Sequence, residues 1–219
     1  EAPVSGVPRN AFITGASGGI GAALARELGR RGWRVTLFAR RGDLLQALVS
    51  ELRAGGVEAF AEEGDVLDAE AVRAAVDRTV ARWGIDMAIA NAGVSITMRA
   101  VAFNLENARQ ILNVNVVGTL HLFDAVLPHM LSRKSGHFVG VASIAGLRGL
   151  PGSAMYSASK AAVQTFLEGS RGELALTGIR VTTVNPGYVR TPMTDRNRFP
   201  MPFLMSAEDA AVVIADGLE

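Results

Sequence analysis

The stretch from residue 10 to residue 28 constrains the fold most strongly, because a glycine-rich turn joins a strand pattern to a helix pattern there. Residues 10–14 form a short apolar run that is typical of a buried strand. The turn has the spacing G-x-x-x-G-x-G from Gly15 to Gly21, and residues 22–28 combine strong helix formers with helical apolar spacing. Glycines let backbone N–H groups approach a pyrophosphate, and a helix N-terminus adds partial positive charge. The stretch therefore predicts the start of a nucleotide-binding unit; a glycine-rich loop without a ligand is the plainer alternative.

Strand and helix patterns alternate along the rest of the chain. Further strands are expected at 34–39, 57–61, 86–90, 137–142 and 179–184, and helices at 43–54, 68–83, 106–133, 154–177 and 207–218. Such alternation predicts an α/β fold, with a doubly wound parallel sheet and helices on both faces. Ligands of these sheets bind beyond the carboxyl ends of the strands. The glycine turn, Asn91, Ser143 and Asn185 each follow a strand and are expected to meet at that edge.

Length and composition exclude several classes of protein. A chain of 219 residues suits one domain, and a net charge of +1 indicates no nucleic-acid partner. The absence of cysteine excludes disulfides and thiolate metal sites, and it is compatible with a reducing compartment. No apolar run approaches the ~18 residues that a membrane helix needs, so no membrane partner is expected.

The chain ends and the histidines carry weaker signals. Residues 1–8 lack the features of a signal peptide and are interpreted as a flexible lead-in to a single domain at 9–219, in a cytoplasmic protein. His121, His129 and His137 have no metal-ligand spacing, so no metal site is expected.

Tyr156 and Lys160 place a phenol and an ammonium four residues apart at the start of an expected helix. Side chains at this spacing share one helical face, roughly 5–6 Å apart at Cβ. An isolated tyrosine has a pKa of about 10, and a nearby cation favours the phenolate. The pair is thus a candidate acid–base centre; a helix-start tyrosine beside a solvated lysine is the alternative.

Several motifs occur together in a fixed order. They are Thr14-Gly15-x-x-x-Gly19-Ile20-Gly21, Asp65-Val66, Asn91-Ala92-Gly93, Asn115, Ser143, Tyr156-x-x-x-Lys160 and Asn185-Pro186-Gly187. In this order and at these spacings the chain resembles the short-chain dehydrogenase/reductase family from about residue 9 to 218. The resemblance implies a single Rossmann-type domain, a nicotinamide cofactor, and hydride transfer between the cofactor and a carbonyl or alcohol.

The resemblance also implies roles for individual residues. Tyr156 is expected to act as general acid in reduction and as base in oxidation, with Lys160 lowering its pKa and binding the nicotinamide ribose. Ser143 is expected to hydrogen-bond the substrate oxygen, and Asn115 to anchor a water-linked proton path. A strand-end cap at Ser143 and a buried bridging amide at Asn115 are the structural alternatives. Expected cofactor contacts are Gly15, Ser17, Gly18, Gly19, Ile20, Gly21, Arg40, Asp65, Val66, Asn91, Ala92, Gly93, Tyr156, Lys160, Pro186, Gly187, Val189 and Thr191.

The end of the second expected strand indicates which nicotinamide cofactor is used. NAD-binding units carry an acidic residue there, whereas this chain has Ala39-Arg40-Arg41. An arginine fork suits the oxygens of a 2′-phosphate, and Ser17 adds a hydroxyl donor. Gly18 stands where NADP-binding members of the family often have a second basic residue. We expect NADP(H) in preference to NAD(H), with Arg40 as the main determinant.

The segment at about 187–206 is rich in proline and in apolar side chains, among them Met193, Phe203 and Met205. Long irregular segments in compact domains are usually functional or mobile. A substrate lid and a plain covering segment are both compatible with this pattern.

Two features bear on assembly. The expected helices at 106–133 and 154–177 have apolar residues on more than one face, which predicts a homodimer or homotetramer joined by these helices. Members of the family usually carry a seventh strand after the last helix, whereas six strands are expected here. Either a seventh strand lies beyond Glu219 or the sheet is one strand short.

Together these observations predict an NADP(H)-dependent oxidoreductase acting on a small to medium, fairly apolar carbonyl or secondary alcohol. The alternative is a non-catalytic NADP-binding regulatory or scaffold protein of the same fold. Retention of Ser143, Tyr156, Lys160 and Asn115 favours the enzyme. Epimerase or dehydratase chemistry on a sugar nucleotide needs a larger substrate domain than this length provides.

Overall fold

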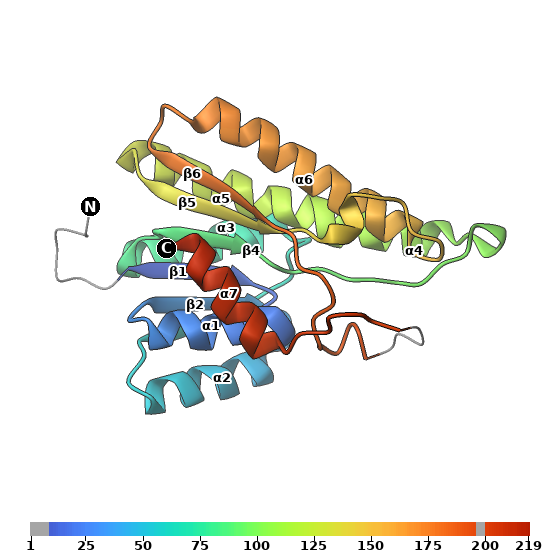
Figure 1. Ribbon diagram of the computed structural model, residues 1–219. Helices are drawn as coiled ribbons and strands as arrows, with labels where there is room; N and C mark the ends of the chain where they lie inside the picture. Colours follow the sequence, from blue (N-terminus) through green and yellow to red (C-terminus); the bar gives the residue numbers. More distant parts are fainter. Residues whose placement is uncertain (1–8, 196–199) are drawn as a thin grey trace.

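Six parallel strands form one sheet in the computed structural model, which describes residues 9–195 and 200–219 (Figure 1). The order across the sheet is β3-β2-β1-β4-β5-β6. The strands are β1 (Asn10–Thr14), β2 (Arg34–Ala39), β3 (Ala59–Glu63), β4 (Met87–Ala90), β5 (Gly136–Val141) and β6 (Ile179–Val184). The chain runs outward from β1 to β3 and then returns to the other side of β1 at β4. The expected doubly wound α/β sheet is confirmed.

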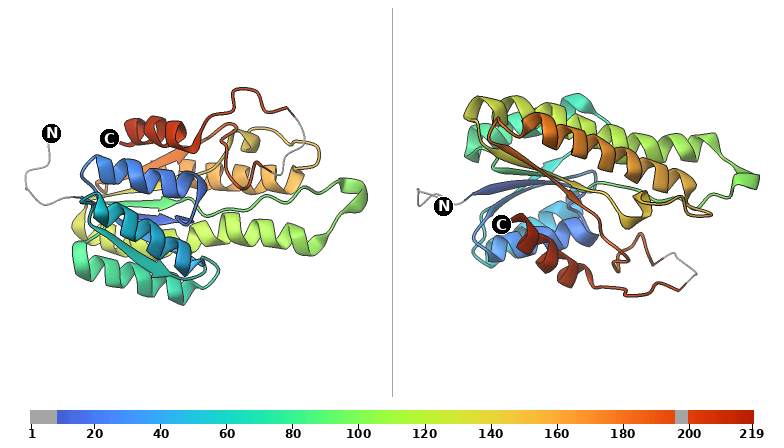
Figure 2. Two further views of the ribbon diagram at one scale, coloured as in Figure 1. Left: turned by 90° about the horizontal axis from the view of Figure 1, so that it is seen from below. Right: turned by 45° about the horizontal axis from the view of Figure 1, so that its top comes forward.

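Helices cover both faces of the sheet, as Figure 2 shows from two further directions. They are α1 (Gly19–Arg30), α2 (Gly42–Ala54), α3 (Ala69–Trp83), α4 (Leu105–Leu112), α5 (Gly118–Arg133), α6 (Ala154–Leu174) and α7 (Ala207–Leu218). Successive strand residues point to opposite faces. Ile13 therefore packs in the layer under α1, α2 and α7, whereas Phe12 packs in the layer under α3, α5 and α6.

Several element boundaries differ from the sequence-based expectation, and two of these differences have clear local reasons. The strand expected at 57–61 begins at Ala59, because the backbone N–H of Val57 donates to the Leu52 carbonyl and closes the end of α2. The helix expected at 154–177 ends at Leu174, because the N–H groups of Ala175 and Thr177 make short-range turn bonds. Asp68, the first residue of the range expected for a helix at 68–83, is the N-cap of α3, and its carboxylate accepts from the N–H of Ala71.

The helix expected at 106–133 is continuous but contains a wide turn. A π-helical segment, η2 (Asn113–Val117), lies between α4 and α5. Single π-turns inside α-helices are frequent at functional sites. Among the described residues, Leu105–Arg133 is the one helix with a length and composition that would suffice to cross a membrane. Its Leu122 and Val126 are instead buried in the layer against the sheet, as in the core helix of a folded domain.

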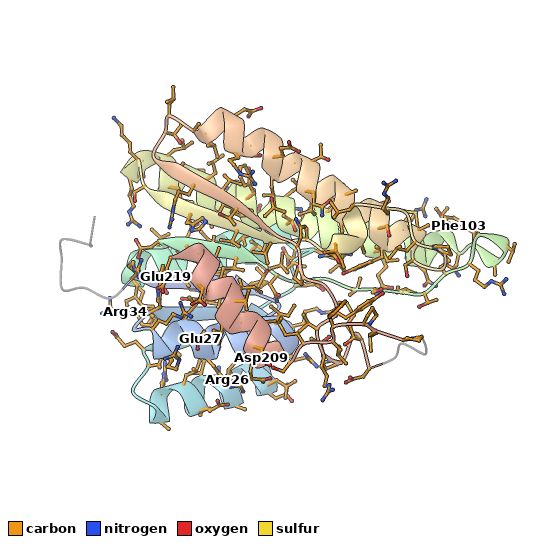
Figure 3. All side chains as sticks on the ribbon, viewed as in Figure 1. Arg26, Glu27, Arg34, Phe103, Asp209 and Glu219 are labelled. Carbon is orange, nitrogen blue, oxygen red and sulfur yellow. The ribbon has the colours of Figure 1, made fainter. Side chains whose placement is uncertain are left out.

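A cluster of ion pairs ties α7 to α1 at the edge of the sheet away from the strands' carboxyl ends. Arg31 donates to Glu27 at 2.7 Å, to Asp216 at 2.6 Å and to Glu219 at 3.0 Å. Arg30 adds two bonds to the Glu27 carboxylate at 2.7 and 2.8 Å. Glu27 and Glu219 are labelled in Figure 3. Although α7 comes last in the chain, this cluster fixes it beside the helix that follows the glycine turn.

The cluster predicts acid-sensitive stability. Arg30 and Arg31 hold the pKa of Glu27 at about 2, so its stabilisation is present above the unfolded pKa of about 4.3 and is lost as pH falls toward 2. Glu27→Gln should lower Tm at pH 7 by roughly 2–12 °C, and this difference should shrink below pH 4.

Thermal unfolding of both proteins from pH 2.5 to 7 measures this. The control is Glu168→Gln, which alters an exposed carboxylate on α6 with no bonded basic side chain in the described part of the chain. A Glu27→Gln difference that stays constant across this pH range would contradict the assignment.

Candidate active site

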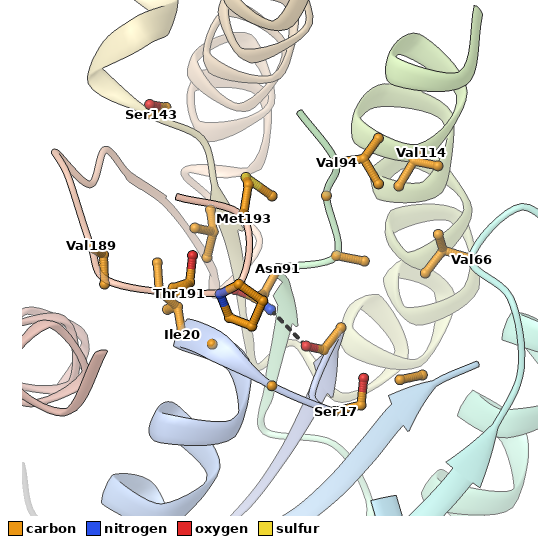
Figure 4. A pocket seen from close by; sticks show the side chains of 18 of the residues that line it. Ser17, Ile20, Val66, Asn91, Val94, Val114, Ser143, Val189, Thr191 and Met193 are labelled. Atoms are coloured by element: carbon orange, nitrogen blue, oxygen red, sulfur yellow. Dashed lines mark hydrogen bonds between the residues drawn. The ribbon is translucent and has the colours of Figure 1, made fainter. Parts of the chain in front are cut away.

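A cavity of about 330 Å³ opens at the carboxyl ends of the strands. It lies between β1 and β4, where successive strands change from one side of β1 to the other. Figure 4 shows Ser17 and Ser143 at opposite ends of it. Val189 and Thr191 lie on one side, and Val66, Val94 and Val114 lie on the other. Ligands of doubly wound sheets bind at this topological switch point. The cavity is thus placed as the sequence predicts.

The glycine turn is packed directly against the loop after β4. Asn91 donates through Nδ2 to the carbonyls of Thr14 and Gly15, and the Thr14 hydroxyl accepts from the N–H of Asn91 at 3.0 Å. Gly15 has a φ of +66°, which favours glycine. A Cβ at Gly21 would lie 2.5 Å from Asn91 Nδ2. Gly21 therefore permits this packing and does not line the cavity, whereas every other residue predicted to contact the cofactor does.

Lys160 is buried in the floor of the cavity. Its Nζ donates to the Val141 carbonyl at 2.8 Å and lies 5.8 Å from the centroid of the Tyr156 ring. Burial lowers the pKa of Lys160 to about 8. An added Cβ at Gly93 would lie 3.5 Å from this ammonium, so the bare backbone of Gly93 leaves the lysine accessible from the cavity.

The Tyr156 phenol behaves differently from the sequence-based expectation. Burial raises its pKa, and a hydrogen bond with the Ser143 side chain opposes that rise without cancelling it. The ammonium of Lys160 is directed to a backbone carbonyl, and desolvation of the phenol outweighs the stabilisation of a phenolate. The protein's own groups therefore hold Tyr156 in its protonated form.

Ser143 combines the two roles that the sequence left open. Its Oγ accepts from the N–H of Ala145 at 3.1 Å, as the cap of the short turn η3 (Ile144–Gly146). The same side chain hydrogen-bonds Tyr156. The cap thus orients the hydroxyl toward the phenol.

Asn115 lies behind the cavity and not on its surface. Its Oδ1 accepts from the N–H of Val94 at 2.7 Å, and its Nδ2 donates to the Val94 carbonyl at 3.0 Å and to Ser159 Oγ at 2.9 Å. The bridging-amide interpretation therefore describes the side chain, which joins the loop after β4 to α6. Its place on a proton path stays a prediction.

The end of the cavity at Ser17, away from Ser143, is basic. Arg40 lies 3.6 Å from Asp65 and its side chain is 66% exposed, whereas Arg41 donates to Ser17 Oγ from both Nε and Nη2, at 3.1 and 2.9 Å. Both arginines line the cavity. Sequence reasoning selected Arg40 and passed over Arg41, although the two are adjacent. The bonds to Ser17 depend on how the turn folds back, which no local pattern reveals.

The segment interpreted as either a lid or a plain covering segment is closed by bonds between its own two ends. Its backbone pairs through Arg190 N–H to the Met205 carbonyl at 2.8 Å and Met205 N–H to the Tyr188 carbonyl at 3.0 Å. A hydroxyl from Thr194 donates to the Val189 carbonyl at 2.7 Å. Within the predicted 187–206 segment, residues 196–199 lie outside the described part of the chain, as does the predicted lead-in at 1–8.

Several residues that line the cavity were not among the catalytic residues or cofactor contacts expected from the sequence. They are Ala39, Arg41, Gly64, Val94, Val114, Val141, Ala142, Pro192, Met193 and Thr194. Most are small or apolar residues adjacent to a predicted contact, so extending each motif by one or two positions would have found them.

Comparison with known proteins agrees with this arrangement. Residues 9–200 match the family model described as short chain dehydrogenase. An uncharacterized oxidoreductase of Myxococcus xanthus is 46% identical over 96% of this chain and 83% of its own length. A 3-oxoacyl-[acyl-carrier-protein] reductase of Staphylococcus aureus is 33% identical over 85% of this chain and 77% of its own length.

Two solved structures are also similar. A variant of the actinorhodin polyketide ketoreductase with NADPH superimposes with a TM-score of 0.89 at 32% identity, covering 97% of this chain and 90% of that one. A short-chain dehydrogenase from Sphingobium yanoikuyae in complex with NADPH has a TM-score of 0.86 at 31% identity, covering 96% and 85%. With the family match and the fold in agreement, this chain belongs to the short-chain dehydrogenase/reductase family of oxidoreductase enzymes.

Proposed function

We propose that the chain is an NADP(H)-dependent oxidoreductase that interconverts a small to medium, fairly apolar carbonyl compound and its alcohol. The observation that carries the proposal is one cavity with Ser143 and Ser17 at opposite ends (Figure 4). Tyr156 interacts with Ser143, Arg41 is bonded to Ser17, and Arg40 also lines the cavity. Ser143 and Tyr156 suit a reacting carbonyl oxygen, and the two arginines suit a phosphate. The two similar solved structures hold NADPH, which supports the same cofactor here.

The residues present fit a nicotinamide dinucleotide. Gly18 and Gly19 line the cavity at the start of α1 without side chains, so backbone N–H groups and the helix dipole face the position of a pyrophosphate. When bound, the nicotinamide ring supplies or accepts the hydride. Arg40 and Arg41 would bind a 2′-phosphate through charge-assisted hydrogen bonds.

The protein's part in the chemistry is to place two hydroxyl donors at the carbonyl oxygen. Hydride addition to a carbonyl leaves negative charge on its oxygen, which hydrogen bonds from Ser143 and Tyr156 stabilise. Because burial keeps Tyr156 protonated, its phenol can transfer a proton to that oxygen as a general acid. Lys160 places a positive charge beside the phenol, which favours the phenolate that the proton transfer leaves.

Exposed apolar side chains next to Ser143 support an apolar substrate. Ile144, Leu147 and Leu150 follow Ser143, and Leu147 is 67% exposed. Met193 lines the cavity from the 187–206 segment and is itself partly exposed. Exposed apolar side chains grouped at a cavity mark a binding surface. We propose that the 187–206 segment closes over the substrate as a lid.

Removing the Tyr156 hydroxyl tests the mechanism. Tyr156→Phe keeps the ring and its packing but loses the proton and one donor, so turnover should fall at least ~10²-fold. NADPH binding, followed by fluorescence, should change little and serves as the control for folding. A variant that retains more than about a tenth of wild-type turnover on the best carbonyl in a panel would refute this role.

The arginine pair should determine cofactor choice. Losing a charge-assisted bond to phosphate costs about 1.5–3 kcal/mol, so Arg40→Ala and Arg41→Ala should each weaken NADPH binding roughly 10- to 150-fold while NADH binding stays constant. Ala39→Asp combined with Arg40→Ala should reverse the preference. Titration of each protein with both cofactors measures this. Arg109→Ala, an exposed arginine on α4, is the matched control. Equal affinity of the wild-type protein for NADPH and NADH would exclude the proposal.

We also propose that the enzyme is a homodimer or homotetramer joined by α5 and α6. Many apolar residues of these helices are buried within the domain, but Leu120 and Leu131 remain 36% and 42% exposed on α5. They lie on one face with the half-buried Leu127, so the outer apolar stripe is narrower than the sequence suggested. Pairing across a two-fold axis would cover it.

A charge placed in this stripe should dissociate the oligomer. Leu120→Arg should sediment as a monomer at micromolar concentration, where the wild-type protein sediments as a dimer or tetramer. Leu44→Arg alters an equally exposed leucine on α2, at the other face of the sheet, and should leave the assembly intact. A wild-type protein that is monomeric and fully active would remove the interface.

A further inference from the structure

Gln164 lies one helical turn beyond Lys160 and two beyond Tyr156 on α6, so the three side chains share a face. Its Nε2 donates to the Ser143 carbonyl at 2.8 Å and to Asn185 Oδ1 at 2.7 Å. Because a backbone carbonyl only accepts hydrogen bonds, the amide must present its nitrogen to Ser143. One –NH₂ group thus joins the loop after β5 to the loop after β6.

These two loops carry different parts of the cavity. The first presents the Ser143 hydroxyl, and the second continues from Asn185 into Pro186 and Gly187, which line the cavity. Backbone bonds join the loops on either side of the amide, from Ala142 N–H to the Val184 carbonyl and from Ile144 N–H to the Pro186 carbonyl. Between these two backbone bonds, at Ser143 itself, the side chain of Gln164 adds a further connection between the two loops.

The turn after Ser143 is shaped to admit this amide. A Cβ at Gly146 would lie 2.6 Å from Gln164 Oε1 and 2.9 Å from the backbone nitrogen of Ala161. Only a glycine leaves space there for the turn to sit against the side chain of Gln164. The sequence therefore provides both the donor and the room that it needs.

We propose that Gln164 is a positioning residue that holds the Ser143 carbonyl and the Asn185 side chain and thereby keeps the Ser143 hydroxyl at Tyr156. The proposal rests on the oxidoreductase function proposed above. Gln164 acts through Ser143 and does not line the cavity. Its nitrogen faces the Ser143 carbonyl, which can only accept, so the position requires a donor. A carboxylate would repel this carbonyl, whereas a carboxylic acid could donate one hydrogen bond to it.

This donor requirement gives a test based on pH. Gln164→Glu should lower kcat about 10- to 100-fold at pH 8, because small misplacements of catalytic groups are costly. The ratio of its kcat to that of the wild type should rise as pH falls and the new carboxyl becomes protonated. Gln164→Met, of similar volume but without a donor, should lose kcat at every pH with no such recovery. Gln46→Glu, on an exposed face of α2, should behave as wild type.

A second readout does not depend on turnover. The chain has two tyrosines, so NMR of ring-labelled tyrosine resolves the Tyr156 phenol, assigned with Tyr156→Phe. Ser143→Ala should move the Tyr156 titration to higher pH, because the hydrogen bond with Ser143 lowers that pKa. Gln164→Met should move it in the same direction by no more than Ser143→Ala does.

The possible outcomes are distinct. An unchanged Tyr156 titration in a folded Gln164→Met protein, or a pH-independent kcat ratio for Gln164→Glu, overturns the positioning role. If the wild-type protein turns over no carbonyl with NADPH while the Tyr156 titration still shifts in Gln164→Met, the proposed function fails and the positioning role stands.

Discussion

The cavity depends on a single helix, α6, which is connected by hydrogen bonds to three of the loops around it. Ser159 accepts from Asn115, which in turn holds Val94. Lys160 reaches the end of β5 at Val141, and one turn later Gln164 joins the loops after β5 and β6. Because these contacts come from consecutive turns of one rigid element, the relative positions of three loops are set by the geometry of the helix rather than by the loops.

The arrangement has an electrostatic cost that explains the state of its titratable groups. A helix packed this closely buries its polar side chains, and burial disfavours a charged lysine and a charged phenolate alike. Burial accordingly lowers the pKa of Lys160 and raises that of Tyr156. The site therefore holds a protonated phenol beside a buried cation. A protonated phenol is the form that can donate a proton to an oxygen that gains negative charge.

The sequence predicted the sheet and most of the cavity because both follow from short-range patterns. Each strand, glycine turn and helix cap has a local cause, and parallel strands necessarily bring their carboxyl ends to one edge. The features it missed depend on contacts between distant segments. Arg41 is bonded to the glycine turn, and Gln164 is bonded to two loops that are remote from each other in sequence. The direction in which the pKa of Tyr156 is shifted was mispredicted, because helical spacing indicates proximity to a cation but not the depth of burial.

The 187–206 segment has both ends fixed, since Tyr188 and Arg190 pair with Met205 and α7 is held on α1 by Arg31. Closing a loop between two fixed ends costs conformational entropy, and this free-energy cost grows only as the logarithm of the loop's length. Doubling the number of residues between the fixed ends costs about 0.6 kcal/mol. Loops of other lengths and compositions could therefore be exchanged between Arg190 and Met205 without refolding the domain. This segment could thus be changed by recombination independently of the helix that carries Tyr156 and Lys160.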